Sequence, residues 1–170
     1  MIYGPNTTAV QSIIDRVARM TDDEIQLLDE AGDSTWDSVN DSVRDTGWQT
    51  AKDRAANPSL DADNDAALEE AREAAWDSAT ARAIDAHWGA SLGEAWEAAK
   101  AAARDAGKDA DWGEGLSPGL SPAWATILAA ITYDLATIEG PYTIFQRDLL
   151  MAPWVSVYGM PEGLIEGAAT

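Results

Sequence analysis

Two short motifs in the sequence resemble signatures of catalytic or metal-binding sites. The first, GASLG at Gly89–Gly93, matches the G-x-S-x-G pattern, in which a serine nucleophile stands on a turn between a strand and a helix and a histidine base follows later in the chain. Here an alanine-rich, helix-favouring segment precedes Ser91, and the single histidine, His87, comes before it. We therefore interpret the motif as a junction of two helices capped by Ser91, and His87 as a packed or capping residue.

The second motif, DADNDAALEEAR at Asp61–Arg72, begins like a calcium-binding loop, with acidic residues at its first, third and fifth positions. Ala66 stands where the sharp turn of such a loop needs glycine, and Arg72 stands where a bidentate glutamate is needed. We interpret Asp61 and Asp63 as capping residues at a helix N-terminus, where the helix dipole favours negative charge. Weak cation binding on charge alone stays open.

The residue inventory argues against most other catalytic chemistry. The chain has no cysteine, which removes disulfides and thiolate metal sites, and its single histidine leaves little room for nucleophile–histidine arrangements. No glycine-rich phosphate loop is present. Acid–base pairs stay open, because there are 30 acidic residues to choose from. The sequence predicts a protein that is not an enzyme and holds no metal and no cofactor.

A tryptophan–aspartate pattern is the most distinctive feature of the sequence. Trp36–Trp48 (WDSVNDSVRDTGW) and Trp76–Trp88 (WDSATARAIDAHW) are identical at five of thirteen positions, and a weaker third copy begins at Trp96. On a helix, a residue nine positions after a tryptophan lies on the opposite side. We therefore expect the indoles to enter the core and the carboxylates to face solvent.

The acidic positions of the copies define a candidate partner-binding face. Like charges one turn apart destabilise a helix slightly, and helix propensity does not require them. Helices of this kind stacked side by side would present rows of negative charge that imitate a phosphate backbone. A purely solvating acidic face is the simpler alternative. The candidate residues are Asp37, Asp41, Asp45, Asp77, Asp85, Glu97 and Asp105.

The formal net charge of −19 limits the partners that the protein can bind. A broadly negative surface repels nucleic acid and anionic membranes, so a basic or nucleic-acid-binding protein is the expected partner. The first residues lack the basic and apolar regions of a signal peptide, and the most apolar stretch, Ala123–Tyr133, is too short to span a bilayer. These features predict a cytoplasmic location.

Helix signals dominate the first two thirds of the chain. Residues 7–20 place Val10, Ile13, Ile14 and Val17 at helical spacing, and Thr21 with Glu24 forms a capping box for a helix ending near Gly32. A third helix is predicted from about Ser34 to Pro58. Residues 61–107 are predicted to form one long helix, or two that meet near Gly89–Gly93, where Ser91 and Glu94 suggest a second capping box.

The last third is predicted to begin with a loop at Gly107–Pro122, rich in glycine and proline. Ser121 and Pro122 then open a helix that runs to Glu139, and a short helix and an irregular apolar segment follow. We expect an all-α fold: a single domain (residues 1–170) of about five to seven helices in a compact bundle. Candidate residues for apolar packing, or for an interface, are Phe145, Leu149, Trp154, Val155 and Tyr158.

The alanine-rich stretches AWDSA, AWEAA and ARDAG, followed by AWATILAAITYDL, resemble uncharacterised alanine/tryptophan/aspartate-repeat proteins of actinobacterial phages, mycobacteriophages among them. Those proteins end in a pattern D-x-L-x-x-P-W-x-x-V-x-G-x-x-P-D/E. The corresponding residues here are Asp148, Leu150, Pro153, Trp154, Val157, Gly159, Pro161 and Glu162, with one residue and not two between Gly159 and Pro161. The repeats here are fewer and degenerate, and residues 107–121 form an insertion. The resemblance implies phage origin and the host cytoplasm, with no established activity to transfer.

Two functions fit these observations. The leading hypothesis is a small acidic phage accessory protein that binds a host protein, as a nucleic-acid mimic or an inhibitor of host defence. The alternative is a phage assembly or virion component that self-associates, as a homo-oligomer, through its alanine and tryptophan faces.

Overall fold

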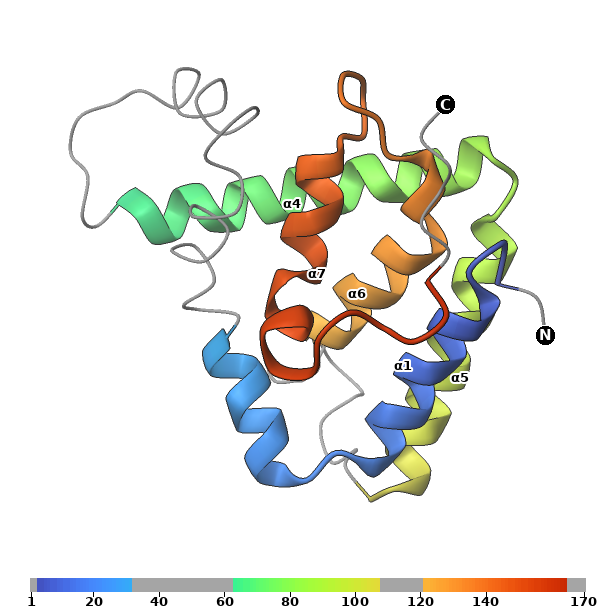
Figure 1. Cartoon of the computed structure of the whole chain (residues 1–170), viewed down its shortest axis with the longest axis vertical. Helices are drawn as coiled ribbons and strands as arrows, with labels where there is room; N and C mark the ends of the chain where they lie inside the picture. Colours follow the sequence, from blue (N-terminus) through green and yellow to red (C-terminus); the bar gives the residue numbers. More distant parts are fainter. Residues whose placement is uncertain (1–2, 32–62, 108–120, 165–170) are drawn as a thin grey trace.

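The computed structural model describes residues 3–31, 63–107 and 121–164, and in these ranges the protein is helical without strands (Figure 1). The all-α prediction is therefore confirmed. The elements in order are α1 (Thr7–Arg19), a helix at 22–31, α4 (Asp63–Asp85), α5 (Gly89–Asp105), α6 (Ser121–Ile131), the short 3₁₀ helix η2 (Tyr133–Leu135) and α7 (Ile144–Tyr158). The helix predicted from Ser34 to Pro58 and most of the loop predicted at Gly107–Pro122 lie outside the described residues.

Helix α6 lies at the centre of the fold, in contact with α1, α4, α5 and α7 (Figure 1). From Pro122 to Ile131 only Ala125 is more than slightly exposed, so this helix is apolar on all sides, as a central helix must be. Its buried Thr126 hydroxyl donates to the Pro122 carbonyl at 2.7 Å, which satisfies a polar group that would otherwise be costly in the core. The helices before and after the predicted loop therefore share one core.

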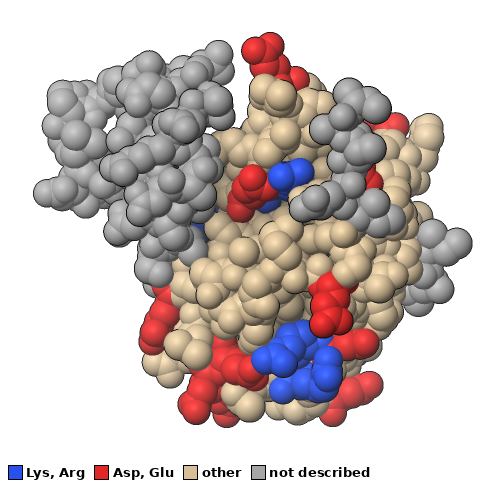
Figure 2. All heavy atoms as spheres, viewed as in Figure 1, with Lys and Arg blue, Asp and Glu red and all other residues tan. Residues whose placement is uncertain are grey.

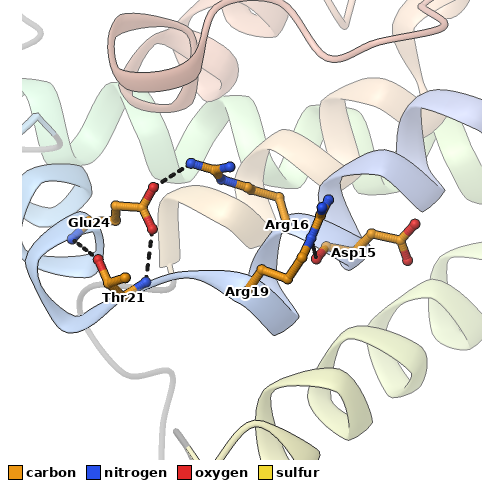
Figure 3. Close-up of polar contacts among 5 residues, drawn as sticks. All are labelled: Asp15, Arg16, Arg19, Thr21 and Glu24. Atoms are coloured by element: carbon orange, nitrogen blue, oxygen red, sulfur yellow. Dashed lines mark hydrogen bonds and ion pairs between the residues drawn. The ribbon is translucent and has the colours of Figure 1, made fainter.

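The N-terminal helices follow the local signals in the sequence. In α1 the side chains of Val10, Ile13, Ile14 and Val17 are buried, as their helical spacing predicts. The helix at 22–31 begins with the predicted capping box: the Thr21 N–H donates to Glu24 Oε2 at 2.8 Å, and the Glu24 N–H donates to Thr21 Oγ1 at 3.2 Å (Figure 3).

Helices α4 and α5 show the same pattern of burial twenty residues apart. Ala75, Ala79 and Ala83 of α4 are completely buried, and so are the equivalent residues of α5, Ala95, Ala99 and Ala103. Trp76 and Trp96, which follow the first alanine of each set, are half-buried. The expectation of indoles in the core therefore needs a correction for these two copies, because small alanine side chains occupy the innermost line and let neighbouring helices approach closely.

Three indoles connect α4, α5 and α6. The rings of Trp76 and Trp96 meet edge to face, with centroids 5.8 Å apart, and Trp96 stacks on the buried Trp124 at 4.8 Å. Both arrangements suit the charge distribution of aromatic rings. Trp96 is therefore the middle ring of the group and joins the two repeat helices to the central helix.

The junction of α4 and α5 lies where the sequence predicts it but is built differently. Helix α4 ends in a Schellman motif: the Trp88 N–H donates to the Ala83 carbonyl at 2.7 Å and the His87 N–H to the Ile84 carbonyl at 2.9 Å. His87 has the positive φ (62°) that this motif requires. Helix α5 then begins at Gly89, so Ser91 lies inside its first turn and is not the N-cap. The predicted cap at Ser91 was wrong.

The chain after α6 also differs from prediction. The helix predicted to run to Glu139 ends at Ile131, and η2 follows. The Thr132 hydroxyl donates to the Leu128 carbonyl at 2.8 Å and lies 3.1 Å from the hydroxyl of buried Tyr142, an arrangement that closes the chain back on itself. The loop after η2 then reverses direction, so that α7 can pack against α6.

Helix α7 begins with a capping box that the sequence analysis missed. The Thr143 N–H donates to Gln146 Oε1 at 2.9 Å, and the Gln146 N–H donates to Thr143 Oγ1 at 3.2 Å. The helix continues through Pro153 to Tyr158, longer than the short helix expected. An interior proline costs about 3 kcal/mol of helix stability. Pro153 and Trp154 are both buried, so packing of this turn offsets that cost.

Candidate partner-binding surface

The four described residues of the predicted acidic face are all exposed. They are Asp77 and Asp85 of α4 and Glu97 and Asp105 of α5. Asp37, Asp41 and Asp45 lie outside the described residues. The carboxylates therefore face solvent, on the side opposite the buried alanines.

The two acidic faces differ in how far their charge is neutralised. On α5, Lys100 Nζ lies 2.8 Å from Glu97 Oε1, one helical turn away. On α4, neither Asp77 nor Asp85 makes an ion pair with a described residue. Because a neutralised carboxylate attracts a basic partner less, α4 presents the stronger field.

Two further carboxylates belong to the α4 face. Glu70 and Glu73 are exposed and precede Asp77 by seven and four residues, which places all three on one side of the helix. The sequence analysis missed them because it compared positions relative to the tryptophans. Counting back from Asp77 with the helical period would have found both. We call Glu70, Glu73, Asp77 and Asp85 the α4 acidic face.

The acidic faces of α4 and α5 are not stacked side by side, as the sequence analysis had assumed. Figure 1 shows the two helices leaving their junction in different directions, with α4 behind α7 and α5 behind α1. Helix α4 packs mainly on α6 and α7, and α5 mainly on α1. The exposed carboxylates therefore form two separate faces that meet at a corner.

The face of the molecule drawn in Figure 2 has a different character. Figure 2 shows a largely uncharged face, with acidic side chains mainly near its edges and a small group of basic side chains near the bottom. Arg16 of α1 forms an ion pair with Glu24 (Figure 3), and its guanidinium lies 4.5 Å from the ring centroid of Tyr158. Hydrogen bonding from the Thr21 backbone and the nearby Arg16 lower the pKa of Glu24. This arginine is therefore engaged within the fold.

A second ion pair, between Arg147 and Asp148 of α7, is also engaged within the fold. Arg147 donates to Asp148 Oδ1 at 2.8 Å and lies over the ring of Tyr133, 4.1 Å from its centroid. The side chain of Arg147 is only 16% exposed. Burial raises the pKa of the neighbouring Tyr142 to about 12, so its hydroxyl stays protonated next to Thr132.

The apolar residues predicted for packing or an interface lie on α7. Leu149 and Trp154 are buried, and Phe145, Val155 and Tyr158 are half-buried and pack against the core. The ring of Trp154 contacts that of Tyr158, with centroids 4.7 Å apart. Most of this surface is therefore used within the chain.

In the described part of the chain, the two motifs that resemble catalytic or metal-binding signatures are not surrounded by the other elements of such sites. No strand precedes Ser91 in the described part of the chain, so the strand–turn–helix of a nucleophile elbow is missing there. His87 is exposed. Across residues 3–31, 63–107 and 121–164, no group of three histidine or acidic side chains is placed to hold a metal ion. No helix in those same ranges has the length and apolarity to cross a membrane.

The C-terminal segment that follows α7 has structural roles in this chain. Gly159 ends α7 with φ 77°, and Pro161 is buried. Gly163 has φ 82°, and a Cβ atom there would lie 2.6 Å from Thr8 Cγ2, so only glycine lets the C-terminal turn reach α1. The segment from Gly159 to Leu164 is therefore packed against the core and against α1.

No family model, no curated protein and no solved structure matches the chain.

Proposed function

We propose that the protein is a small acidic phage accessory protein that binds a basic, nucleic-acid-binding protein of the host cytoplasm through the α4 acidic face. The observation that supports this most is the exposure of the carboxylates. Of the seventeen acidic side chains whose exposure is described, fifteen are exposed and none is buried. The fold therefore leaves its negative charge available to a partner.

The distribution of basic residues supports the same proposal. The side chains of Arg16, Lys100 and Arg147 are paired with carboxylates of the same chain. The carboxylates of the α4 acidic face form no ion pair with any residue that the structure describes. A line of unneutralised carboxylates along a rigid helix offers an arginine- or lysine-rich surface several charge-assisted contacts in a fixed spacing. Nucleic-acid mimicry is the form of binding that this spacing favours.

Self-association through the alanine and tryptophan faces, the alternative function, has weaker support, because the innermost alanines of α4 and α5 are completely buried. The apolar residues of α7 also pack within the chain. Leu149 and Trp154 would have to leave the core to reach another copy. Repulsion between two chains of net charge −19 opposes any close contact at low ionic strength.

Affinity capture tests the proposal. The immobilised protein is incubated with lysate of an actinobacterial host at low salt, eluted with stepwise increases in salt, and the eluate is identified by mass spectrometry. We expect basic nucleic-acid-binding proteins that elute as salt screens the charges. Failure to retain any basic protein at low salt would contradict the proposal.

A competition arm separates mimicry from binding elsewhere on the partner. Duplex DNA added to the wash should displace the captured protein if both occupy the same basic surface. A captured protein that DNA does not displace would overturn the mimicry while leaving the interaction in place.

A further inference from the structure

The corner between α4 and α5 is held by a residue in a strained conformation. His87 is the only non-glycine residue with positive φ among the described residues. The left-handed region is sterically unfavourable for an L-residue, because the Cβ atom crowds the backbone. At the equivalent position after α5, Gly107 has φ 72° without this cost, and the sequence of the first copy has glycine there as well, Gly47.

The rest of the junction is close to helical. Trp88, the N-cap residue of α5, has φ −101° and ψ 9°, close to the α region, and its side chain makes no capping hydrogen bond. A change of conformation centred on His87 would therefore join α4 and α5 into one helix from Asp63 to Asp105. The joined helix would replace the two turn hydrogen bonds, from the His87 and Trp88 N–H groups, with regular ones and satisfy the first N–H groups of α5.

The packing around the corner suits an exchange between two copies. Helices α1 and α4 both precede His87 in the chain, and they have hardly any contact with each other. They pack instead on the elements beyond the hinge, α1 on α5 and α6, and α4 on α6 and α7. A second copy can supply all of these contacts again, because only the hinge differs between the closed chain and the exchanged one.

We propose that the α4–α5 corner is a strained hinge that opens to form a domain-swapped dimer, in which residues before His87 pack on residues after it from a second copy. Short hinges under strain favour such an exchange, since opening releases the strain and keeps the native contacts. The charge of −19 on each copy opposes dimer formation.

Refolding at high protein concentration, followed by size-exclusion chromatography with light scattering, tests the hinge. We expect a dimer that increases with salt, because salt screens the repulsion between copies. His87→Gly relieves the strain of the closed corner and disfavours the joined helix, so it should lower dimer formation by at least about tenfold. His87→Ala keeps a side chain with a Cβ at the left-handed position and raises the helix propensity, so it should form at least as much dimer as the wild type.

The geometry of the dimer is tested with spin labels. The chain has no cysteine, so labels can be placed at Ala74→Cys and Ala101→Cys, two exposed positions on either side of the hinge. In a joined helix they lie about 40 Å apart along its axis, and in a bent chain they lie closer. Labelled chains are diluted with unlabelled ones, so that only the distance within a chain is measured.

Three results would overturn the proposal: a strict monomer at every salt and protein concentration, a dimer with the short label distance, or equal dimer formation by His87→Gly. The proposal is independent of partner binding. Swapping increases with salt and binding of a basic partner decreases, so failure of one is distinguishable from failure of the other.

Discussion

Helices α4 and α5 bury alanines at equivalent positions of the repeat, but these alanines pack against different helices. The alanines of α5 belong to the cluster around α1, and Ala75 and Ala79 of α4 belong to the cluster around α7. The outer faces differ more, because Glu97 on α5 is paired with Lys100 and the α4 acidic face makes no such pair among its described neighbours. The repeat thus conserves a packing surface, while its charge, and any binding that depends on it, varies from copy to copy.

The aromatic contacts give the largest expected difference between the two helices. Within the group of three indoles, Trp96 contacts the rings of both Trp76 and Trp124, whereas Trp76 contacts only that of Trp96. We expect Trp96→Ala to lower the free energy of unfolding by about 3 kcal/mol, and Trp76→Ala by about 1 kcal/mol less. Urea unfolding followed by circular dichroism measures both. An equal or larger loss for Trp76→Ala would show that the middle ring has no special role.

The buried alanines should tolerate no extra volume in either helix. Ala79→Leu and Ala99→Leu insert three carbons between close helices, and each should cost about 1–3 kcal/mol of stability. Exposed Ala81 and Ala101 provide matched controls, whose replacement by leucine should change stability by less than about 0.5 kcal/mol. Similar losses at buried and exposed positions, in thermal or urea unfolding, would contradict the shared burial pattern.

The helix ends should respond to substitution with opposite signs. His87→Gly should stabilise the monomer by about 1 kcal/mol, since glycine adopts the positive φ without strain. Gly107→Ala should destabilise it by a similar amount through backbone conformation alone, because no atom lies within 4 Å of a Cβ there. Unfolding at low protein concentration measures both. A destabilised His87→Gly would show that the histidine side chain contributes more than its backbone costs.

The smallest expected effect comes from the charges on the two outer faces. Glu73→Gln removes repulsion from Glu70 and Asp77 and should stabilise slightly, whereas Glu97→Gln loses its pair with Lys100 and should destabilise slightly. Each change amounts to a few tenths of a kcal/mol at low salt. The opposite signs should disappear in 1 M salt, where the Debye length is about 3 Å.

Local signals in the sequence were enough to predict much of the fold. The apolar spacing of Val10, Ile13, Ile14 and Val17 and the capping box of Thr21 and Glu24 depend on neighbours within one or two turns, and both predictions are confirmed. The end of α6 could not be predicted in the same way. It depends on Thr132 meeting Tyr142 after a chain reversal, which is a tertiary contact.

The candidate surface was only partly predictable for a related reason. Exposure of Asp77, Asp85, Glu97 and Asp105 follows from helical periodicity. The angle between α4 and α5 depends on the left-handed conformation of His87, which few residues other than glycine adopt. The sequence favoured a cap at Ser91 instead. The sequence analysis placed the charged helices side by side because it could not predict this angle. In the structure, the carboxylates of α4 and α5 form two separate faces that meet at a corner.

Two variants with the same net charge test the central claim, that the α4 acidic face binds a basic partner. The first neutralises that face with Glu70→Gln, Glu73→Gln, Asp77→Asn and Asp85→Asn. The control neutralises four exposed carboxylates on other elements with Asp29→Asn, Asp134→Asn, Glu139→Gln and Glu162→Gln.

Dissociation constants for the captured partner are measured at one salt concentration. We expect the α4 variant to bind at least about tenfold more weakly than the wild type and the control to lose no more than about threefold, because contact charges contribute more than distant ones. Equal loss in both variants would show that the partner responds only to total charge, and would contradict the claim.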